Sequence, residues 1–334
     1  MKKIYADSEV CSWHLSQLNL EILEEITAGH PAVFHMPYPY DSSFETKIEQ
    51  AVAICPKIVI LVSELHRDSA KFIINHQHSK IDYFICGTIE GYANKSWMDW
   101  VITTCDFYKE TEILTQLVPY KVKPRYFDVL LGWQKPHRDI AYNFIVDNSL
   151  IDKVTMTYLI DRTKPINQQG IWEVDIPDNI FNTITNIKYL GKPISLSQLI
   201  PINIYNQTAY TVVCETNYDN HYSFYTEKIV KPILAERLFI VLSGQHYLRN
   251  LRSLGFKTFD GIIDETYDSI SDNDQRFKLA CEQITYLTNQ PQEEILEKIQ
   301  PITEHNKRVM IETDWYGDFA KELRAVLLDH TRQN

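Results

Sequence analysis

A carboxylate and an ammonium stand side by side at Glu227 and Lys228, where a polar run becomes an apolar one with helical spacing. Thr226 is a typical N-cap residue, so the pair is predicted to lie in the first turn of a helix. The free backbone N–H groups of such a turn attract anions. Lys228 would add a positive charge for a phosphate, and Glu227 would accept hydrogen bonds from a ribose diol. The pattern therefore suits a sugar nucleotide, while an ordinary capped surface helix is the alternative interpretation.

Glu64 directly follows an apolar run, residues 57–63, that is predicted to be a strand buried on both faces of a parallel sheet. A carboxylate in this place lies outside the carboxyl end of the strand, where parallel sheets bind ligands. The alternative is that Glu64 caps the next segment or pairs with Arg67.

Two further polar stretches follow predicted strands. Arg138 lies at the end of a basic run that starts at Gly132 and opens a helix, which predicts an anion site, with a solvated basic turn as the alternative. Glu215 and Thr216 follow the apolar run 209–214. Because ligands bind outside the carboxyl ends of parallel strands, these stretches and Glu64 are expected to converge on one cleft.

The elements that would position these residues alternate along the chain, which predicts an α/β fold with parallel sheets and helical crossovers. The expected strands are 32–36, 57–63, 81–86, 126–131, 154–160, 209–214 and 238–242. The expected helices are 44–54, 69–75, 97–117, 137–148, 229–236, 247–254, 272–288, 292–308 and 315–328. Two prolines and two lysines in 118–124 predict a linker, and hence domains at 1–122 and 123–312, with a C-terminal helix at 313–334 that packs back on the first domain.

Composition restricts the function further. The 334 residues suit two domains, and the net charge of −11 disfavours broad nucleic-acid binding, although a local basic groove would escape this argument. Six scattered cysteines without a Cys-x-x-Cys pair indicate a reducing compartment. The polar N-terminus resembles no signal peptide, and the chain has no apolar run of membrane-spanning length. We therefore expect a cytoplasmic protein, in a host cell if the chain is viral.

Several common chemistries lack their motifs. The sequence contains no Gly-x-Gly-x-x-Gly, Walker or Gly-x-Ser-x-Gly motif, which disfavours dehydrogenases, ATPases and serine hydrolases. Asp272 and Asp274 have the spacing of a divalent-metal motif, but they stand at a predicted helix start, where aspartates act as caps. No cofactor is expected to be required, and a divalent metal is not indicated.

The run from Cys214 to Lys228 resembles the signature of the α-1,3/1,4-fucosyltransferase family, which shows Phe-Glu-Asn-Ser/Thr and then Tyr-Val-Thr-Glu-Lys before a helix and an apolar strand. Arg138 resembles an arginine that opens a helix in the family's donor-binding domain. Ser63-Glu64-Leu65 resembles the family's Gly-Glu-Asn segment. The chain departs from the family at Ser63, and it has Thr216 where the family has asparagine.

This resemblance implies two Rossmann-like domains whose parallel sheets face a central cleft, the GT-B glycosyltransferase fold. The N-terminal domain would bind the acceptor, and the C-terminal domain would bind a nucleoside-diphosphate sugar, a GDP-sugar first among the candidates. The sugar, with fucose as one candidate, would be transferred to a hydroxyl with inversion. Glu64 would be the general base. The implied donor-binding residues are Arg138, Glu215, Thr216, Tyr225, Glu227 and Lys228, of which Arg138 and Lys228 would neutralise the diphosphate.

Two other functions fit the same residues. The first is a sugar-nucleotide or glycan-binding module without catalysis, which would bind nucleotide tightly and not turn it over. The second is a glycosyltransferase acting on modified viral DNA, against which the acidic balance counts.

Overall fold

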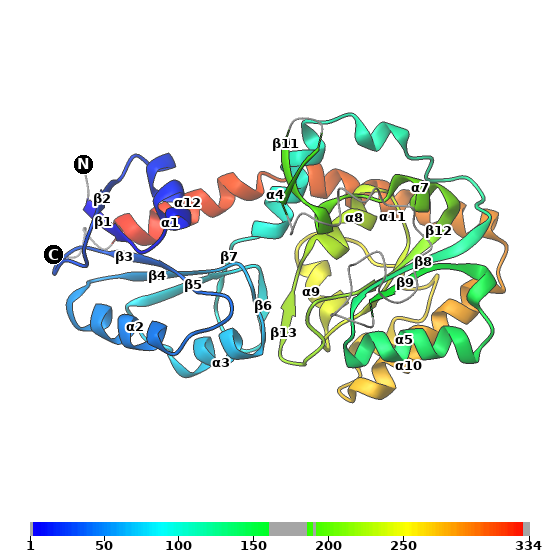
Figure 1. The fold of residues 1–334 in the computed structure, drawn as a ribbon, viewed down its shortest axis with the longest axis horizontal. Coiled ribbons are helices and arrows are strands. Elements are labelled where there is room, and N and C mark those ends of the chain that lie inside the picture. Colours follow the sequence, from blue (N-terminus) through cyan, green and yellow to red (C-terminus); the bar gives the residue numbers. More distant parts are fainter. Residues whose placement is uncertain (1–2, 160–185, 190–191, 330–334) are drawn as a thin grey trace. The chain divides into compact units, whose positions relative to one another are not determined.

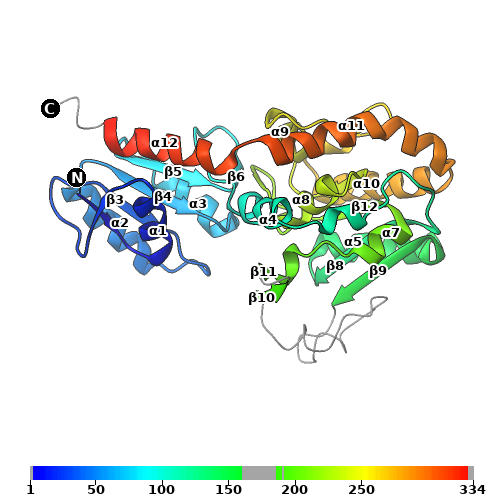
Figure 2. The ribbon, with the colours of Figure 1, turned by 90° about the horizontal axis from the view of Figure 1, so that it is seen from above.

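Parallel strands form the principal sheets of this protein, as the alternating sequence predicts. The computed structural model describes residues 3–159, 186–189 and 192–329. The chain divides into two units, one made of Met1–Ile102 with Asp314–Asn334 and the other of Thr103–Thr313 (Figures 1 and 2). The α/β class is thereby confirmed.

The first unit contains a six-stranded parallel sheet in the order β2-β1-β3-β4-β5-β7. Its strands are β1 (Lys3–Ala6), β2 (Glu21–Leu23), β3 (Ala32–His35), β4 (Ile58–Val62), β5 (Ile81–Ile85) and β7 (Lys95–Ser96). All residues of β4 are buried, as its continuous apolar run predicts.

Helices cover both faces of this first sheet (Figure 1). One face carries α2 (Ser43–Ile54) and α3 (Arg67–Asn75), and the other carries α1 (Glu9–Gln17) and α12 (Trp315–Asp329). On α12, Phe319 packs on Phe84 and Trp97 with ring centroids 5.5 and 5.7 Å apart. The C-terminal helix therefore completes the core of the first unit.

The second unit contains a four-stranded parallel sheet in the order β14-β12-β8-β9. Its strands are β8 (Arg125–Trp133), β9 (Val154–Leu159), β12 (Thr208–Cys214) and β14 (Phe239–Leu242). The helices α5 (Pro136–Asp147) and α10 (Asn273–Thr288) lie along one face. The other face carries α7 (Ile202–Gln207), α8 (Glu227–Leu234) and α11 (Gln292–Glu312) (Figure 1).

The described residues also form helices and short strands that are not part of the two principal sheets or of the helices that cover them. They are β6 (Gly87–Ile89), α4 (Asp99–Lys109), β10 (Asn186–Tyr189), β11 (Lys192–Ser195), β13 (Tyr222–Phe224) and α9 (Tyr247–Ser253). Among the described helices, none is both long enough and apolar enough to span a bilayer. All six cysteines are buried thiols without disulfides.

A buried arginine ties the second sheet together. Arg237, which is 4% exposed, forms an ion pair with Asp128 on β8 at 2.7 Å. Its Nε also donates to Thr211 Oγ1 on β12 at 2.8 Å, and its Nη1 donates to the carbonyls of Tyr205 and Thr208. The guanidinium therefore links two central strands to the end of α7, with its charge fully paired inside the protein.

The predicted domain boundary after residue 122 falls inside the second unit, which starts at Thr103 within α4. Hydrogen bonds with Gln198 connect residues 103–108 of α4 to the second unit. The Gln198 amide nitrogen donates to the hydroxyls of Thr103 and Thr104 at 2.8 and 2.9 Å. In addition, Tyr108 donates to the Gln198 carbonyl at 3.0 Å. The end of α4 is thus held by side chains from a distant part of the sequence.

The predicted helix 97–117 is shorter than expected, because α4 ends at Lys109 and only a 3-10 turn follows at Ile113–Gln116. The sequence prediction also missed β1 and α1. Within β1 only Ile4 is buried, so no apolar run marks the strand. In α1 the buried face includes His14 while Trp13 is 54% exposed, which obscures the helical pattern.

Candidate anion-binding site

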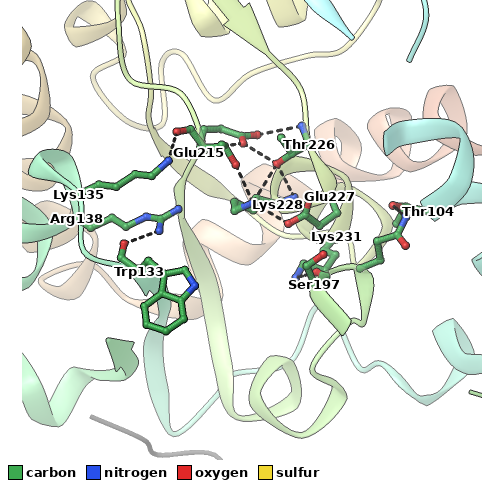
Figure 3. A network of polar contacts seen from close by, with 12 residues as sticks. Thr104, Trp133, Lys135, Arg138, Ser197, Glu215, Thr226, Glu227, Lys228 and Lys231 are labelled. Carbon is green, nitrogen blue, oxygen red and sulfur yellow. Dashed lines mark hydrogen bonds and ion pairs between the residues drawn. The ribbon is translucent and has the colours of Figure 1, made fainter. Parts of the chain in front are cut away.

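The carboxyl ends of two neighbouring strands bring most of the predicted site residues together. In the second sheet β8 and β12 pair directly, β8 ends at Trp133 before α5, and β12 ends at Cys214. The N-terminus of α8 lies against the same end (Figure 3). The starts of α5 and α8 therefore lie at the same carboxyl end, the place where parallel sheets bind ligands.

The start of α8 is capped as the sequence predicts. Thr226 has extended backbone, and its Oγ1 accepts a hydrogen bond from the backbone N–H of Lys228 at 3.3 Å. The same hydroxyl donates to Glu215 Oε2 at 2.7 Å. The cap is therefore linked directly to the end of β12, which fixes the position of the helix start.

Glu215 is fully buried, and protein groups occupy both of its carboxylate oxygens. Tyr247 donates to Oε1 at 2.8 Å, while the Thr216 backbone N–H and the Thr226 hydroxyl donate to Oε2. Burial raises the pKa of Glu215, and Lys228 and these donors oppose that effect. Tyr225 is also buried, with its ring centroid 5.2 Å from that of Tyr247. These two predicted ligand residues thus form the inner support of the site.

Glu227 and Lys228 form an ion pair of 2.7 Å at the helix start (Figure 3). Burial opposes the negative charge of Glu227, but Lys228 and then Lys231 outweigh it, so the pKa of the carboxyl lies below its usual value. Lys228 also donates to Thr216 Oγ1 at 3.1 Å, and 29% of its side chain remains exposed. An ammonium that solvent can reach is therefore held at the positive end of α8.

Arg138 lies on the first turn of α5 with only 4% of its surface exposed. Its Nη1 donates to the Trp133 carbonyl at 2.7 Å, and its buried Nε has no partner among the described residues. Burial lowers the pKa of Arg138, while Glu215 and Glu227 among others oppose this. A Cβ at Gly132 would lie 3.0 Å from Nη1, so the glycine leaves the room that the guanidinium occupies.

Further groups at this end were missed by the sequence prediction. Lys135 donates to the Thr216 carbonyl at 2.7 Å, and Lys231 donates to the Ser197 carbonyl at 2.6 Å (Figure 3). Lys231 stands four residues after Glu227 on one helix, a spacing that could have indicated it. Lys135 belongs to the basic run before Arg138, whereas nothing local to Tyr247 points to Glu215. Four cations lie at this end, Lys135, Arg138, Lys228 and Lys231, together with the carboxylates of Asp139, Glu215 and Glu227.

His137 is buried beside Arg138, and its Nε2 donates to the Glu215 carbonyl at 2.9 Å. Burial lowers its pKa to about 3, below the ~6.5 of an unfolded chain. Between these values the unfolded chain binds a proton that the folded chain does not, so stability should fall as the pH drops through this window.

His137→Gln keeps a side-chain N–H for the Glu215 carbonyl but cannot be protonated. We expect this variant to lose less stability than the wild type between about pH 7 and about pH 5, measured by urea denaturation. His78→Gln, at an exposed position, serves as the control. Equal acid losses in the wild type and His137→Gln would contradict the prediction.

Glu64, the predicted general base, belongs to the first unit, where it follows β4 and is partly exposed. Its carbonyl accepts a hydrogen bond from Ser69 Oγ at 3.1 Å in the first turn of α3. The other predicted site residues all belong to the second unit. Asp272 caps α10 by accepting from the Gln275 N–H at 2.8 Å, as predicted in preference to metal binding.

No protein-family model matches this chain, and no curated protein matches its sequence.

Proposed function

We propose that this protein is an inverting glycosyltransferase whose second unit binds a nucleoside-diphosphate sugar, with a GDP-sugar as the first candidate. The observation that carries the proposal is the buried guanidinium of Arg138 in the first turn of α5, whose Nε has no hydrogen-bond partner among the residues that the structure describes. A buried guanidinium N–H without an acceptor is costly, and a bound anion would supply the missing partner. Lys228 at the start of α8 adds a second cation that a ligand can reach.

The diphosphate would bind to Arg138 and Lys228, which stand in the first turns of α5 and α8 at the positive ends of the two helices. Glu227, which is ionised and held by Lys228, would accept hydrogen bonds from the ribose hydroxyls. Glu215 would hold the start of α8 in place and would not contact the ligand, because its carboxylate oxygens already accept hydrogen bonds from Thr226 and Tyr247. This division of roles differs from the sequence-based expectation that Glu215 itself contacts the donor.

The resemblance to the fucosyltransferase family assigns the acceptor to the first unit in a GT-B arrangement, with Glu64 as the general base. In the reaction, the acceptor oxygen attacks the anomeric carbon and gives its proton to Glu64. The bond from the anomeric carbon to the phosphate oxygen breaks, and the electron pair leaves with the diphosphate. Arg138 and Lys228 stabilise the charge that develops on this leaving group.

The test is calorimetry with GDP and UDP, followed by turnover of GDP-fucose, GDP-mannose, UDP-glucose and UDP-N-acetylglucosamine. Binding of one diphosphate and turnover of its sugar conjugate would support the proposal. Binding without turnover would identify a sugar-nucleotide-binding module instead. If neither diphosphate binds, the anion site and the proposed function both fail.

Two substitutions separate binding from chemistry. Lys228→Ala is expected to weaken diphosphate binding about tenfold, because one charge-assisted contact is lost. Glu64→Gln should leave that affinity unchanged and reduce turnover about a hundredfold or more, since a general base typically contributes this much. Lys278→Ala, at an exposed position of α10, is the matched control. Unchanged turnover in both test variants would refute the assigned roles.

A further inference from the structure

Three polar side chains lie at the carboxyl edge of the first sheet and are connected by hydrogen bonds. None of them has a role in the function proposed above. Asp7 follows β1, His35 ends β3, and Ser63 follows β4. These three strands are neighbours in the order β1-β3-β4 and run parallel. Their carboxyl ends therefore meet at one edge, the place where parallel sheets bind ligands.

The three side chains are connected. Asp7 Oδ1 accepts a hydrogen bond from the backbone N–H of His35 at 2.9 Å. The His35 Nε2 lies 3.0 Å from Ser63 Oγ. Both Asp7 and Ser63 remain partly exposed, so these side chains reach the surface. A serine hydroxyl held by a ring nitrogen at a strand end has a fixed orientation, which an isolated surface serine lacks.

The imidazole itself is held by packing. Its ring stands nearly perpendicular to that of Trp97, at 81° and with centroids 5.9 Å apart, and Trp97 is buried. Burial lowers the pKa of His35, while Asp7 acts in the opposite direction. The ring is therefore mostly neutral near neutral pH. In the tautomer protonated on Nδ1, Nε2 accepts the Ser63 hydrogen and leaves the lone pairs of Oγ for another donor.

We propose that Ser63 is an acceptor-binding residue, whose Oγ accepts a hydrogen bond from a second hydroxyl of the acceptor, or from the hydrogen of an attacking water that does not go to Glu64, and that His35 and Asp7 are its positioning residues. The proposal deepens the proposed function and rests on it. Ser63 precedes Glu64 directly, so the residue that would orient the nucleophile and the residue that would take its proton are neighbours in the sequence after β4. The proton and electron balance is the one given above, since Ser63 only orients the nucleophile.

The experiment uses hydrolysis of GDP-fucose, GDP-mannose, UDP-glucose and UDP-N-acetylglucosamine, in which water replaces the unidentified acceptor. For the donor hydrolysed fastest, Ser63→Ala is expected to lower kcat about tenfold with the calorimetric affinity for its diphosphate unchanged. Ser63→Thr keeps the hydroxyl and should retain most of the activity. His35→Leu removes the group that accepts the Ser63 hydrogen, so it should resemble Ser63→Ala.

The pH dependence separates orientation from mere support of the fold. Protonated His35 donates to Ser63 Oγ and occupies a lone pair, so wild-type kcat should fall at acid pH, and His35→Gln should lose this component. Among the described residues, the titratable groups that interact electrostatically with His35 are Asp7, which follows β1, and His14 from α1. His78→Gln in the same unit is the control, and Glu64→Gln shows the component due to the base.

The proposal would be overturned if Ser63→Ala had the same kcat as the wild type. It would also be overturned if Ser63→Thr had an unchanged melting temperature but did not retain the activity. If the wild type binds GDP or UDP but hydrolyses none of the four donors, the proposal is also overturned. The anion site in the second unit would still stand in that case. Failure of both diphosphates to bind would remove the proposed function itself, and with it the premise of this inference.

Discussion

Arg138→Met is expected to weaken diphosphate binding about a hundredfold, the largest effect of any single substitution on ligand affinity. The guanidinium is buried and donates to the Trp133 carbonyl, and within the described part of the chain nothing accepts from its Nε. Charge-assisted hydrogen bonds to phosphate contribute about 1.5–3 kcal/mol, and the guanidinium can form more than one. Calorimetry with GDP and UDP measures the loss.

Three further variants make this prediction specific. Arg138→Lys keeps the charge but not the planar fork, so it should recover only part of the affinity. Gly132→Ala keeps the arginine, but its Cβ would lie 3.0 Å from Nη1 and displace the guanidinium, which should also weaken binding. Arg249→Met, at an exposed position of α9, removes the same charge elsewhere in the unit and should have little effect. Equal affinities for the wild type and Arg138→Met would rule out a diphosphate at this site.

The largest expected effect on stability is that of Arg237→Met, about 3–5 kcal/mol lost from the second unit. The substitution leaves the carboxylate of Asp128, which is 1% exposed, without its cationic partner. It also removes the donors to Thr211 and to the carbonyls of Tyr205 and Thr208. Hydrogen exchange at the amides of β8 and β12 reports this loss separately from the stability of the first unit.

The double variant Asp128→Asn with Arg237→Met supplies the control for that prediction. Removing both charges leaves no uncompensated carboxylate, so the double variant should be more stable than the sum of the single losses implies. Additive losses would show that the ion pair is not coupled and that the hydrogen bonds to neutral groups account for the whole effect.

The parts of the site that were predictable from the sequence depend on local physics. Thr226 as a cap, Glu227 and Lys228 in the first turn, and Asp272 as a cap require only a few neighbouring residues. The meeting of Gly132–Arg138 with Glu215–Thr216 followed from the geometry of parallel strands, which needs only the order of elements. The position of Glu64 relative to these groups stays a prediction.

What the sequence did not predict depends on contacts between distant segments. Glu215 is an internal support because Tyr247, from α9, and Thr226 occupy its oxygens. No pattern around Glu215 indicates either partner. The start of the second unit inside α4 depends likewise on Gln198, far along the chain. Short strands such as β1 escape prediction because a single buried side chain carries no periodicity.

The first unit is assembled from both ends of the sequence, with α12 closing a core that residues 1–102 begin. During synthesis on the ribosome, the second unit emerges before α12. It can therefore fold before Phe319 is available to pack on Trp97 and Phe84. Until α12 leaves the exit tunnel, that unfinished apolar face is exposed to chaperones. The first unit would thus complete its core last, after the second unit has left the ribosome.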